Sequence, residues 1–311
     1  MSVHADHVCV GVDAGGTRVA AVAARGETII GSGSAGPANA TVVGVDAAAR
    51  AIADAVNIAA RHAEPLVAVV GAAGAGRHSV AEALRRSVAA QLPGACTIIV
   101  EDDVRIALRA AIPEGPGAVI VAGTGSVAYA ENRDATARLG GGGYLLGDEG
   151  SGFAVGLAAV RLLLRCYEGR RRFDDTAQFV ARSLDVDGRD ALLDRVYGVD
   201  AGPSSVVRIA SLAPAIVALA TKGDDVSGGI VRNAVDKLAA LGCDVARAVG
   251  LTQPRFCFGG GLLRHGGLPA DALMRALSER LSGVEFARTR TAPELAALDV
   301  ARSLAVHMAC A

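Results

Sequence analysis

The sequence predicts an α/β protein built from two similar lobes, each with a mixed sheet. A run of three short strands followed by alternating helices and strands occurs twice, first from about residue 8 and again from Pro116. Glycine-rich turns separate the three strands of each run, which favours an antiparallel meander. Two such lobes in a chain of 311 residues leave a cleft between them, where small ligands usually bind.

The first lobe is expected over residues 1–115. Apolar runs of strand length lie at 7–14, 17–24, 27–33, 65–71 and 96–102. Helical spacing of apolar residues follows at 44–63, 79–92 and 103–112. Ser79 stands at the start of the second of these helices and is the expected N-cap.

The second lobe is expected over residues 116–311 and repeats the pattern. Its predicted strands lie at 117–125, 126–132, 137–143, 255–261 and 283–289. Its predicted helices lie at 149–169, 270–281 and about 293–311, with a helical insertion at about 174–251. We expect the last of these helices to pack back on the first lobe.

Composition and charge disfavour several classes of protein. The formal net charge is −1 and no cluster of Lys and Arg stands out, which disfavours nucleic acid or an anionic membrane as a partner. No apolar run reaches the length of a membrane span, and the first residues lack the pattern of a signal peptide. The six cysteines are scattered without a C-x-x-C pair, which disfavours a zinc or iron–sulfur site. We therefore expect a cytoplasmic protein.

Three glycine turns each close a predicted strand: "DAGGT" at 13–17, "AGTGS" at 122–126 and "FGGGL" at 258–262. Glycine permits a positive φ and lets a bulky anion approach the main-chain N–H groups. A tight hairpin also uses glycine, but corresponding turns in both lobes favour a phosphate site. The stretch "GAAGAGRHS" at 71–79 lacks the lysine of a P-loop, so the site must come from hairpins.

Acidic residues follow two of the predicted strands. Asp13 stands beside the first glycine turn, where its carboxylate can hold Mg²⁺ directly or through water, or can cap the turn. Glu101, Asp102 and Asp103 end a strand and open a helix, the usual location of a catalytic group in such a lobe. One of these three acids can accept the proton of an attacking hydroxyl, and helix capping explains the others.

A second glycine-rich stretch, "GGGGYLLGDEGSG" at 140–152, contains Asp148 and Glu149 at the start of a predicted helix. The helix dipole favours carboxylates there, so capping is one interpretation. The preceding glycines indicate a close approach of the backbone to a ligand. Paired carboxylate acceptors suit the vicinal hydroxyls of a sugar, which is the other interpretation.

These motifs resemble those of the BadF/BadG/BcrA/BcrD-type ATPase family, which includes N-acetylglucosamine kinases, within the actin/hexokinase/Hsp70-like phosphotransferase fold. The resemblance covers nearly the whole chain and is specific at "GVDAGGT", "AGTGS" and "GDEGSG", in this order and spacing. It implies two actin-like (ribonuclease H-like) lobes with an ATP cleft between them.

The resemblance also implies site residues, matched motif by motif. Those implied for ATP and its phosphates are Gly15, Gly16, Thr17, Gly123, Thr124, Gly125, Ser126, Gly259, Gly260 and Gly261. Those implied for the sugar are Asn39, Asp103, Gly141, Gly142 and Asp148. The catalytic base falls on Asp103, with Asp102 as its rival because the local alignment can slip, and Asp13 is implied for Mg²⁺.

The chain departs from the family pattern at two positions. The family's "GGWG" reads Gly140 to Gly143 here, so Gly142 replaces a tryptophan that shapes the sugar pocket, and the nearby Tyr144 is the residue that can compensate. Ala296 stands where a glycine for helix contact is common.

The function that the resemblance implies is an ATP-dependent kinase that phosphorylates an amino sugar, N-acetylglucosamine or a glucosamine-like hexose, with an Asp as general base. ATP and Mg²⁺ are its implied cofactors, and relatives lead us to expect a homodimer. Two alternatives stay open: an ATPase that activates a partner enzyme, and a sugar- or nucleotide-binding regulator without turnover.

Overall fold

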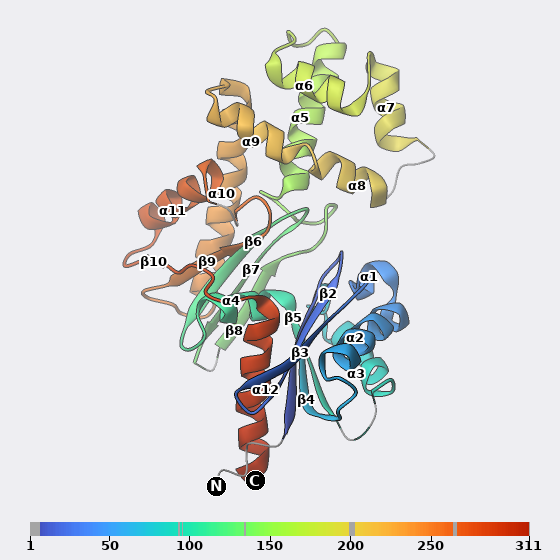
Figure 1. Ribbon diagram of the computed structural model, residues 1–311. Coiled ribbons are helices and arrows are strands. Elements are labelled where there is room, and N and C mark those ends of the chain that lie inside the picture. Colours follow the sequence, from blue (N-terminus) through green and yellow to red (C-terminus); the bar gives the residue numbers. More distant parts are fainter. Residues whose placement is uncertain are drawn as a thin grey trace. The chain divides into compact units, whose positions relative to one another are not determined.

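The computed structural model (Figure 1) describes residues 7–92, 94, 96–133, 135–198, 203–263 and 266–310. The chain divides into two compact units. Unit 1 comprises Met1–Glu114 with Thr289–Ala311, and unit 2 comprises Gly115–Arg288. Each unit contains one five-stranded mixed sheet with helices, so the α/β class predicted from the sequence is confirmed.

The sheet of unit 1 has the strand order β3-β2-β1-β4-β5. Its strands are β1 (Val8–Ala14), β2 (Val19–Arg25), β3 (Thr28–Ala35), β4 (Pro65–Ala72) and β5 (Thr97–Asp102). The first three form the antiparallel meander, whereas β4 and β5 run parallel to β1. The register pairs Ala14 with Ala72, and Ala72 with Asp102. The carboxyl ends of β1, β4 and β5 therefore meet at one edge of the sheet.

Helices cover both faces of this sheet (Figure 1). They are α1 (Ala40–Val43), α2 (Val45–Ala59), α3 (His78–Ala89), α4 (Asp103–Ala111) and α12 (Pro293–Cys310). Val10 and Val12 of β1 pack toward α2 and α3, whereas Cys9 packs toward α12 with Leu298. This alternation is the period of two that a strand buried on both faces requires.

The last helix lies directly on β1, and a glycine makes this close approach possible. A Cβ at Gly11 would lie 2.1 Å from both the Glu294 carbonyl oxygen and the Leu298 nitrogen. Ala296, where the family pattern led us to expect a glycine, is 4% exposed and belongs to the apolar cluster beneath α12. In this chain the glycine at the contact is thus Gly11 on the strand, and the helix has none.

The sheet of unit 2 has the strand order β10-β9-β6-β7-β8. Its strands are β6 (Gly117–Ala122), β7 (Ser126–Asn132), β8 (Ala135–Gly140), β9 (Arg255–Gly259) and β10 (Glu285–Phe286). Here β6, β7 and β8 form the antiparallel meander, and β9 runs parallel to β6 and to β10. The order of elements in unit 1 recurs.

Seven helices among the described residues belong to unit 2, and they pack around one apolar core. They are α5 (Gly152–Tyr167), α6 (Asp175–Leu184), α7 (Arg189–Tyr197), α8 (Pro203–Ala210), α9 (Ala213–Thr221), α10 (Asp225–Ala248) and α11 (Leu268–Arg280). The long α10 runs alongside the sheet, and α11 packs against α10 (Figure 1). Ile120, Phe256, Leu163 and Leu238 are fully buried where strands and helices meet.

Three local predictions were wrong. The helix expected to start with Ser79 as its N-cap begins at His78, with Arg77 at the cap position and no side-chain cap. The strand expected at 283–289 contains only two residues, because β10 pairs with β9 at Glu285 and Phe286 alone. The strand expected at 137–143 is shifted to Ala135–Gly140, which leaves the glycine run in the loop after it.

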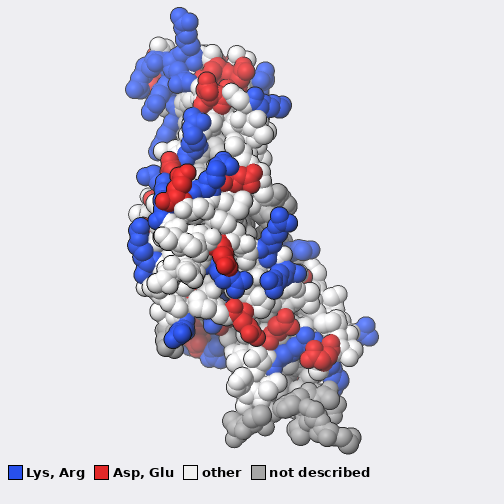
Figure 2. Space-filling view, turned by 90° about the vertical axis from the view of Figure 1, so that its left-hand side faces the viewer, with Lys and Arg blue, Asp and Glu red and all other residues white. Residues whose placement is uncertain are grey.

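Five described cysteines are free thiols, and all but Cys96 are buried; the side chain of Cys310 lies outside the described side chains. On the face shown in Figure 2, basic and acidic side chains are interspersed among uncharged residues. Among the described residues no single helix is both long and apolar enough to cross a membrane. One pair, Ser205–Thr221 with Asp225–Ala248, meets that test by length and composition, across a bend of 117°.

Candidate functional site

The carboxyl edge of the unit 1 sheet gathers the first set of predicted site residues. Asp13 lies one residue before the end of β1, and its register partner on β4 is Gly71. The turn that follows is closed by the Gly15 amide, which donates to the Arg18 carbonyl at 3.0 Å. Gly16 and Thr17 are exposed, and a Cβ at Gly16 would meet no atom within 4 Å. The tip of this turn is therefore open to a ligand.

Asn39 is held beside the same turn. The Ala38 amide donates to the Gly15 carbonyl at 3.0 Å, which ties the segment before α1 to the turn. The side-chain oxygen of Asn39 accepts from the Thr41 amide at 3.1 Å and from the Thr41 hydroxyl at 2.7 Å. The amide nitrogen of Asn39 makes no hydrogen bond within the described part of the chain, so its two N–H groups can donate to a ligand.

The acids at the end of β5 have different roles. Asp102 is the N-cap of α4, and its side chain accepts from the Val104 amide at 3.4 Å. Glu101 forms an ion pair with Arg105, one helical turn onward. Asp103 occupies the first position of α4, after the N-cap, and its carboxyl group shares a hydrogen bond with the Asp102 side chain. The capping interpretation thus applies to Asp102 and leaves Asp103 as the stronger candidate for the base.

The surroundings of Asp103 favour its protonated form near neutral pH. Burial, a hydrogen bond with the Asp102 side chain and the charges of Asp102 and Asp13 raise the pKa of Asp103 to about 7. An opposing contribution comes from the Val104 backbone amide. A carboxyl group with such a pKa can accept a proton and release it at neutral pH, as a general base must.

The same carboxylates are candidates for binding Mg²⁺. The described residues hold no group of three or more His, Cys, Asp or Glu side chains arranged to bind a metal ion. Mg²⁺ in kinases is usually held by one or two carboxylates together with waters and substrate phosphates, so such a group is not required. The mutual repulsion of Asp13, Asp102 and Asp103, expressed in the pKa of Asp103, fits a cation at this edge.

In unit 2 the second and third glycine turns lie side by side. Strands β6 and β9 are parallel, with Val121 paired to Gly259, so the turns after them leave the same edge of the sheet. The Leu262 amide donates to the Ala122 carbonyl at 3.0 Å, which joins the two turns. Gly260, with φ of 80°, packs so closely that a Cβ would lie 2.2 Å from the Ala122 oxygen.

The glycines of these turns have two different roles. A Cβ at Gly123 or at Gly261 would meet no atom within 4 Å, so these two positions face open space. A Cβ at Gly125 would instead lie 2.8 Å from each carboxylate oxygen of Asp148. Thr124 is exposed at the tip of the turn, whereas Ser126 is buried and begins β7. Glycine positions that face open space in a turn after a strand are typical of a phosphate site.

Asp148 lies over this second turn and does not cap α5. The N-cap of α5 is Ser151, whose hydroxyl accepts from the Ala154 amide at 3.2 Å. One carboxylate oxygen of Asp148 accepts from the Ser126 amide at 3.1 Å. Burial raises the pKa of Asp148, and the hydrogen bond from the Ser126 amide opposes that rise. Neither Asp148 nor Glu149 is therefore explained by capping.

The glycine run before Asp148 forms an exposed loop with apolar side chains. Gly141, with φ of 65°, packs against the Arg138 guanidinium, and the three atoms nearest to a Cβ at Gly142 would all belong to Leu146, at 3.6 Å. The ring of Tyr144 meets the ring of Phe153 edge to face, with centroids 5.4 Å apart. Leu145 and Leu146 are 79% and 88% exposed. Gly142, where the resemblance led us to expect a tryptophan, thus lies in a loop with exposed apolar side chains.

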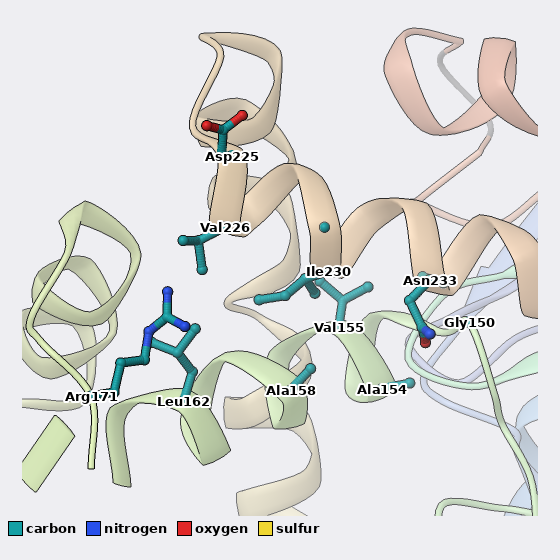
Figure 3. A pocket seen from close by; sticks show the side chains of 12 residues that line it. Gly150, Ala154, Val155, Ala158, Leu162, Arg171, Asp225, Val226, Ile230 and Asn233 are labelled. Atoms are coloured by element: carbon teal, nitrogen blue, oxygen red, sulfur yellow. The ribbon is translucent and has the colours of Figure 1, made fainter. Parts of the chain in front are cut away.

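A pocket of about 390 Å³ in unit 2 lies apart from these residues (Figure 3). It lies between α5 and the first half of α10, whose Val155 and Ile230 side chains line it, with Arg171 at one end. Gly150 is its link to the stretch that contains Asp148, but no residue predicted for ATP or sugar lines it. Its lining is mostly apolar, and we assign it no role in phosphoryl transfer.

Sequence reasoning missed residues that hold these sites in place. Gly71 admits Ile106 of α4, since a Cβ there would lie 2.7 Å from the isoleucine side chain. Gly74, with φ of 83°, leaves room for the Asn39 side chain, whose oxygen would be 2.6 Å from a Cβ. Both glycines lie in the stretch 71–79 that was set aside because it lacks a P-loop lysine. The signal was a glycine at each of these positions, one near the end of β4 and one in the turn after it.

Comparison with known proteins gives a family match and two partial relatives. A model of the BadF/BadG/BcrA/BcrD ATPase family matches residues 10–297. An N-acetylmuramic acid/N-acetylglucosamine kinase from Clostridium acetobutylicum is 33% identical over 144 residues, 45% of this chain and 45% of that protein. An N-acetyl-D-glucosamine kinase from Dictyostelium discoideum is 28% identical over 185 residues, 58% of this chain and 57% of that protein. The chain spans about half the length of the curated relatives it matches.

Among solved structures, that of a candidate N-acetylglucosamine kinase from Chromobacterium violaceum matches with a TM-score of 0.73 and 22% identity. The match covers 95% of this chain and 99% of that chain. At this level of identity, the likeness shows that the two chains share a fold.

Proposed function

Because the chain belongs to the BadF/BadG/BcrA/BcrD ATPase family, we propose that it is an ATP-dependent kinase of an amino sugar, N-acetylglucosamine or a glucosamine-like hexose. The observation that carries this proposal is Asp103, whose pKa is raised to about 7 at the edge of the sheet where Asp13 and the first glycine turn lie. An ATPase that only hydrolyses ATP can activate a water molecule in other ways, whereas a sugar kinase needs a base for the acceptor hydroxyl.

In the proposed reaction, Asp103 accepts the proton of one sugar hydroxyl as that oxygen attacks the γ-phosphorus of ATP. The bond between the γ-phosphorus and the β,γ-bridging oxygen breaks, and ADP leaves with the electron pair of that bond. Protonated Asp103 then returns its proton to solvent. The pKa of about 7 suits both halves of this cycle.

The glycine turns are the proposed phosphate sites. The amides around Gly16 in unit 1 and around Gly123 in unit 2 would donate to phosphate oxygens, and the hydroxyls of Thr17 and Thr124 add donors. The third turn, Gly259 to Gly261, is the proposed contact for the adenosine. Asp13 would hold Mg²⁺ directly or through water, and the bound cation would neutralise charge on the β- and γ-phosphates.

Asn39 and Asp148 are the proposed sugar ligands, one a donor and the other an acceptor. The free N–H groups of Asn39 suit a hydroxyl or carbonyl oxygen of the sugar, and the Asp148 carboxylate suits a hydroxyl hydrogen. The backbone of Gly141 and Gly142 would line the same site. Tyr144, anchored on Phe153, is the apolar surface available to an acetamido group where relatives have tryptophan.

The test is ADP release from Mg²⁺–ATP by the purified protein, without sugar and with N-acetylglucosamine, glucosamine, N-acetylmuramic acid or glucose. We expect strong stimulation by at least one amino sugar. Asp103→Asn should nearly abolish this stimulation while ATP still binds, whereas Asp54→Asn, on the exposed face of α2, should keep it. Sugar-independent hydrolysis would instead favour an ATPase that acts on a partner enzyme. ATP binding without turnover would favour a regulator.

A further inference from the structure

We propose that Asp148 is a positioning residue for the second glycine turn, residues 123–126, in addition to its proposed contact with the sugar. This inference rests on the proposed function, because it assumes that the turn binds nucleotide phosphates. Its basis is the hydrogen bond from the Ser126 amide to the Asp148 carboxylate at 3.1 Å. Ser126 is only 3% exposed, so its N–H group has little access to water and depends on this partner.

The carboxylate fills the space over the turn. Both of its oxygens lie 2.8 Å from the point where a Cβ at Gly125 would be, which is closer than any real Cβ contact. A side chain at position 125 would therefore displace the Asp148 carboxylate. Asp148 itself has a φ of 61°, in the left-handed region that residues other than glycine seldom adopt.

Backbone hydrogen bonds hold the rest of the stretch 148–153 against the same turn. The Ser126 hydroxyl donates to the Glu149 carbonyl at 2.8 Å. The Gly152 amide donates to the Gly123 carbonyl at 2.7 Å, and the Phe153 amide to the Thr124 carbonyl at 3.2 Å. These contacts anchor the turn to the start of α5, and the Asp148 carboxylate is the only side chain from 148–153 with a recorded hydrogen bond to a turn amide among the described residues.

Charge and hydrogen bonding predict different results for two substitutions of Asp148. Asparagine keeps an oxygen that can accept from the Ser126 amide, and it removes a negative charge beside the proposed phosphates. Alanine removes the acceptor and leaves a buried N–H group without a partner. A residue that only binds sugar would affect nucleotide affinity in neither variant when sugar is absent.

The experiment measures binding of the Mg²⁺ complex of the non-hydrolysable ATP analogue AMPPNP by calorimetry, without sugar. We expect Asp148→Ala to weaken binding about tenfold, as for a lost hydrogen bond to a buried donor. Asp148→Asn should bind at least as tightly as the parent protein. Glu149→Gln is the matched control, because only the backbone carbonyl of Glu149 contacts the turn, and it should leave nucleotide affinity unchanged. Parental affinity in Asp148→Ala, or equal losses in the Ala and Asn variants, would overturn the proposal.

Two further measurements test the positioning role. A second variant serves if Asp148→Ala folds poorly, and hydrogen exchange serves if the parent protein binds no nucleotide. Gly125→Ala should displace the Asp148 carboxylate from the turn and weaken AMPPNP binding by a similar factor, although the sequence still contains Asp148. Amide hydrogen exchange over residues 123–128 should be faster in Asp148→Ala and Gly125→Ala than in the parent and Asp148→Asn. Unchanged exchange would refute the positioning role. A parent protein that shows this exchange pattern but binds no nucleotide would instead contradict the proposed function.

Discussion

Replacing Asp103 by asparagine should stabilise the protein, by an amount that grows with pH. Burial and the neighbouring Asp102 and Asp13 raise the pKa of Asp103 from 3.8 to about 7. Between these values the folded protein keeps a proton that the unfolded chain releases, so the free energy of unfolding falls as pH rises from about 4 to about 7. Above pH 7 the folded protein carries the full cost of the charged group. Asparagine cannot ionise and removes this dependence.

The size of the effect follows from the shift. At about 1.4 kcal/mol per pKa unit, a shift of about 3 units corresponds to at most about 4 kcal/mol at pH 8. At pH 5 only the unfolded chain is largely ionised, and the cost is about 1.5 kcal/mol. The stabilisation by Asp103→Asn should therefore be about 2.5 kcal/mol larger at pH 8 than at pH 5. Any change in packing contributes equally at both pH values and cancels in this difference.

The assay is urea unfolding at pH 5 and pH 8, followed by circular dichroism because the chain has no tryptophan. If the two units unfold in separate steps, the pH-dependent step is that of unit 1, which contains Asp103. Asp54→Asn, an exposed carboxylate on α2, is the control and should show little difference between the two pH values. A stabilisation by Asp103→Asn that is the same at both pH values would refute the reasoning about the buried carboxyl group.

Three further predictions follow from the same structure. Sugar-dependent ADP release should rise with pH through about 7 and then level off, because Asp103 must lose its proton to act as a base; a rise centred near pH 4 would contradict this role. Gly11→Ala should lower the free energy of unfolding by about 2 kcal/mol or more, since its Cβ would meet the backbone of α12 at 2.1 Å. Gly36→Ala, with nothing within 4 Å, should change it by less than about 0.5 kcal/mol, and equal urea midpoints would refute the close contact. Gly142→Trp should lower KM for N-acetylglucosamine but not for ATP, because a Cβ at Gly142 would make only ordinary contacts at 3.6 Å and the neighbouring Leu145 and Leu146 side chains are exposed; an unchanged sugar KM in a folded variant would contradict the proposed sugar site.

Much of the fold could be predicted because its signals are local. Alternating apolar residues and glycine turns mark the three-stranded meander in each unit, and parallel strands follow helices of matching length. The two-residue β10 could not be predicted, since its pairing ends at Phe286 although β9 continues to Gly259, and no local pattern marks that end. The predicted N-cap at Ser79 was wrong, because α3 begins at His78, one residue before the predicted helix.

The sequence offers the candidate site residues but not their partners in the fold. Glycine turns and strand-end acids are visible in the sequence, whereas the bond between Asp148 and Ser126 joins residues 22 positions apart. The choice between Asp102 and Asp103 depends on a single helical position, which no periodicity resolves. Gly11 belongs by sequence to the first phosphate motif, yet its packing partner Leu298 is at the other end of the chain.

The most direct test of the central claim is to identify the phosphorylated product. The purified protein would be incubated with Mg²⁺–ATP and N-acetylglucosamine, or the amino sugar that stimulates ADP release most strongly, and followed by ³¹P NMR. The proposed function predicts a sugar phosphate ester that forms in step with ADP and is absent with Asp103→Asn. Inorganic phosphate as the sole new product, formed at the same rate with and without sugar, would contradict it.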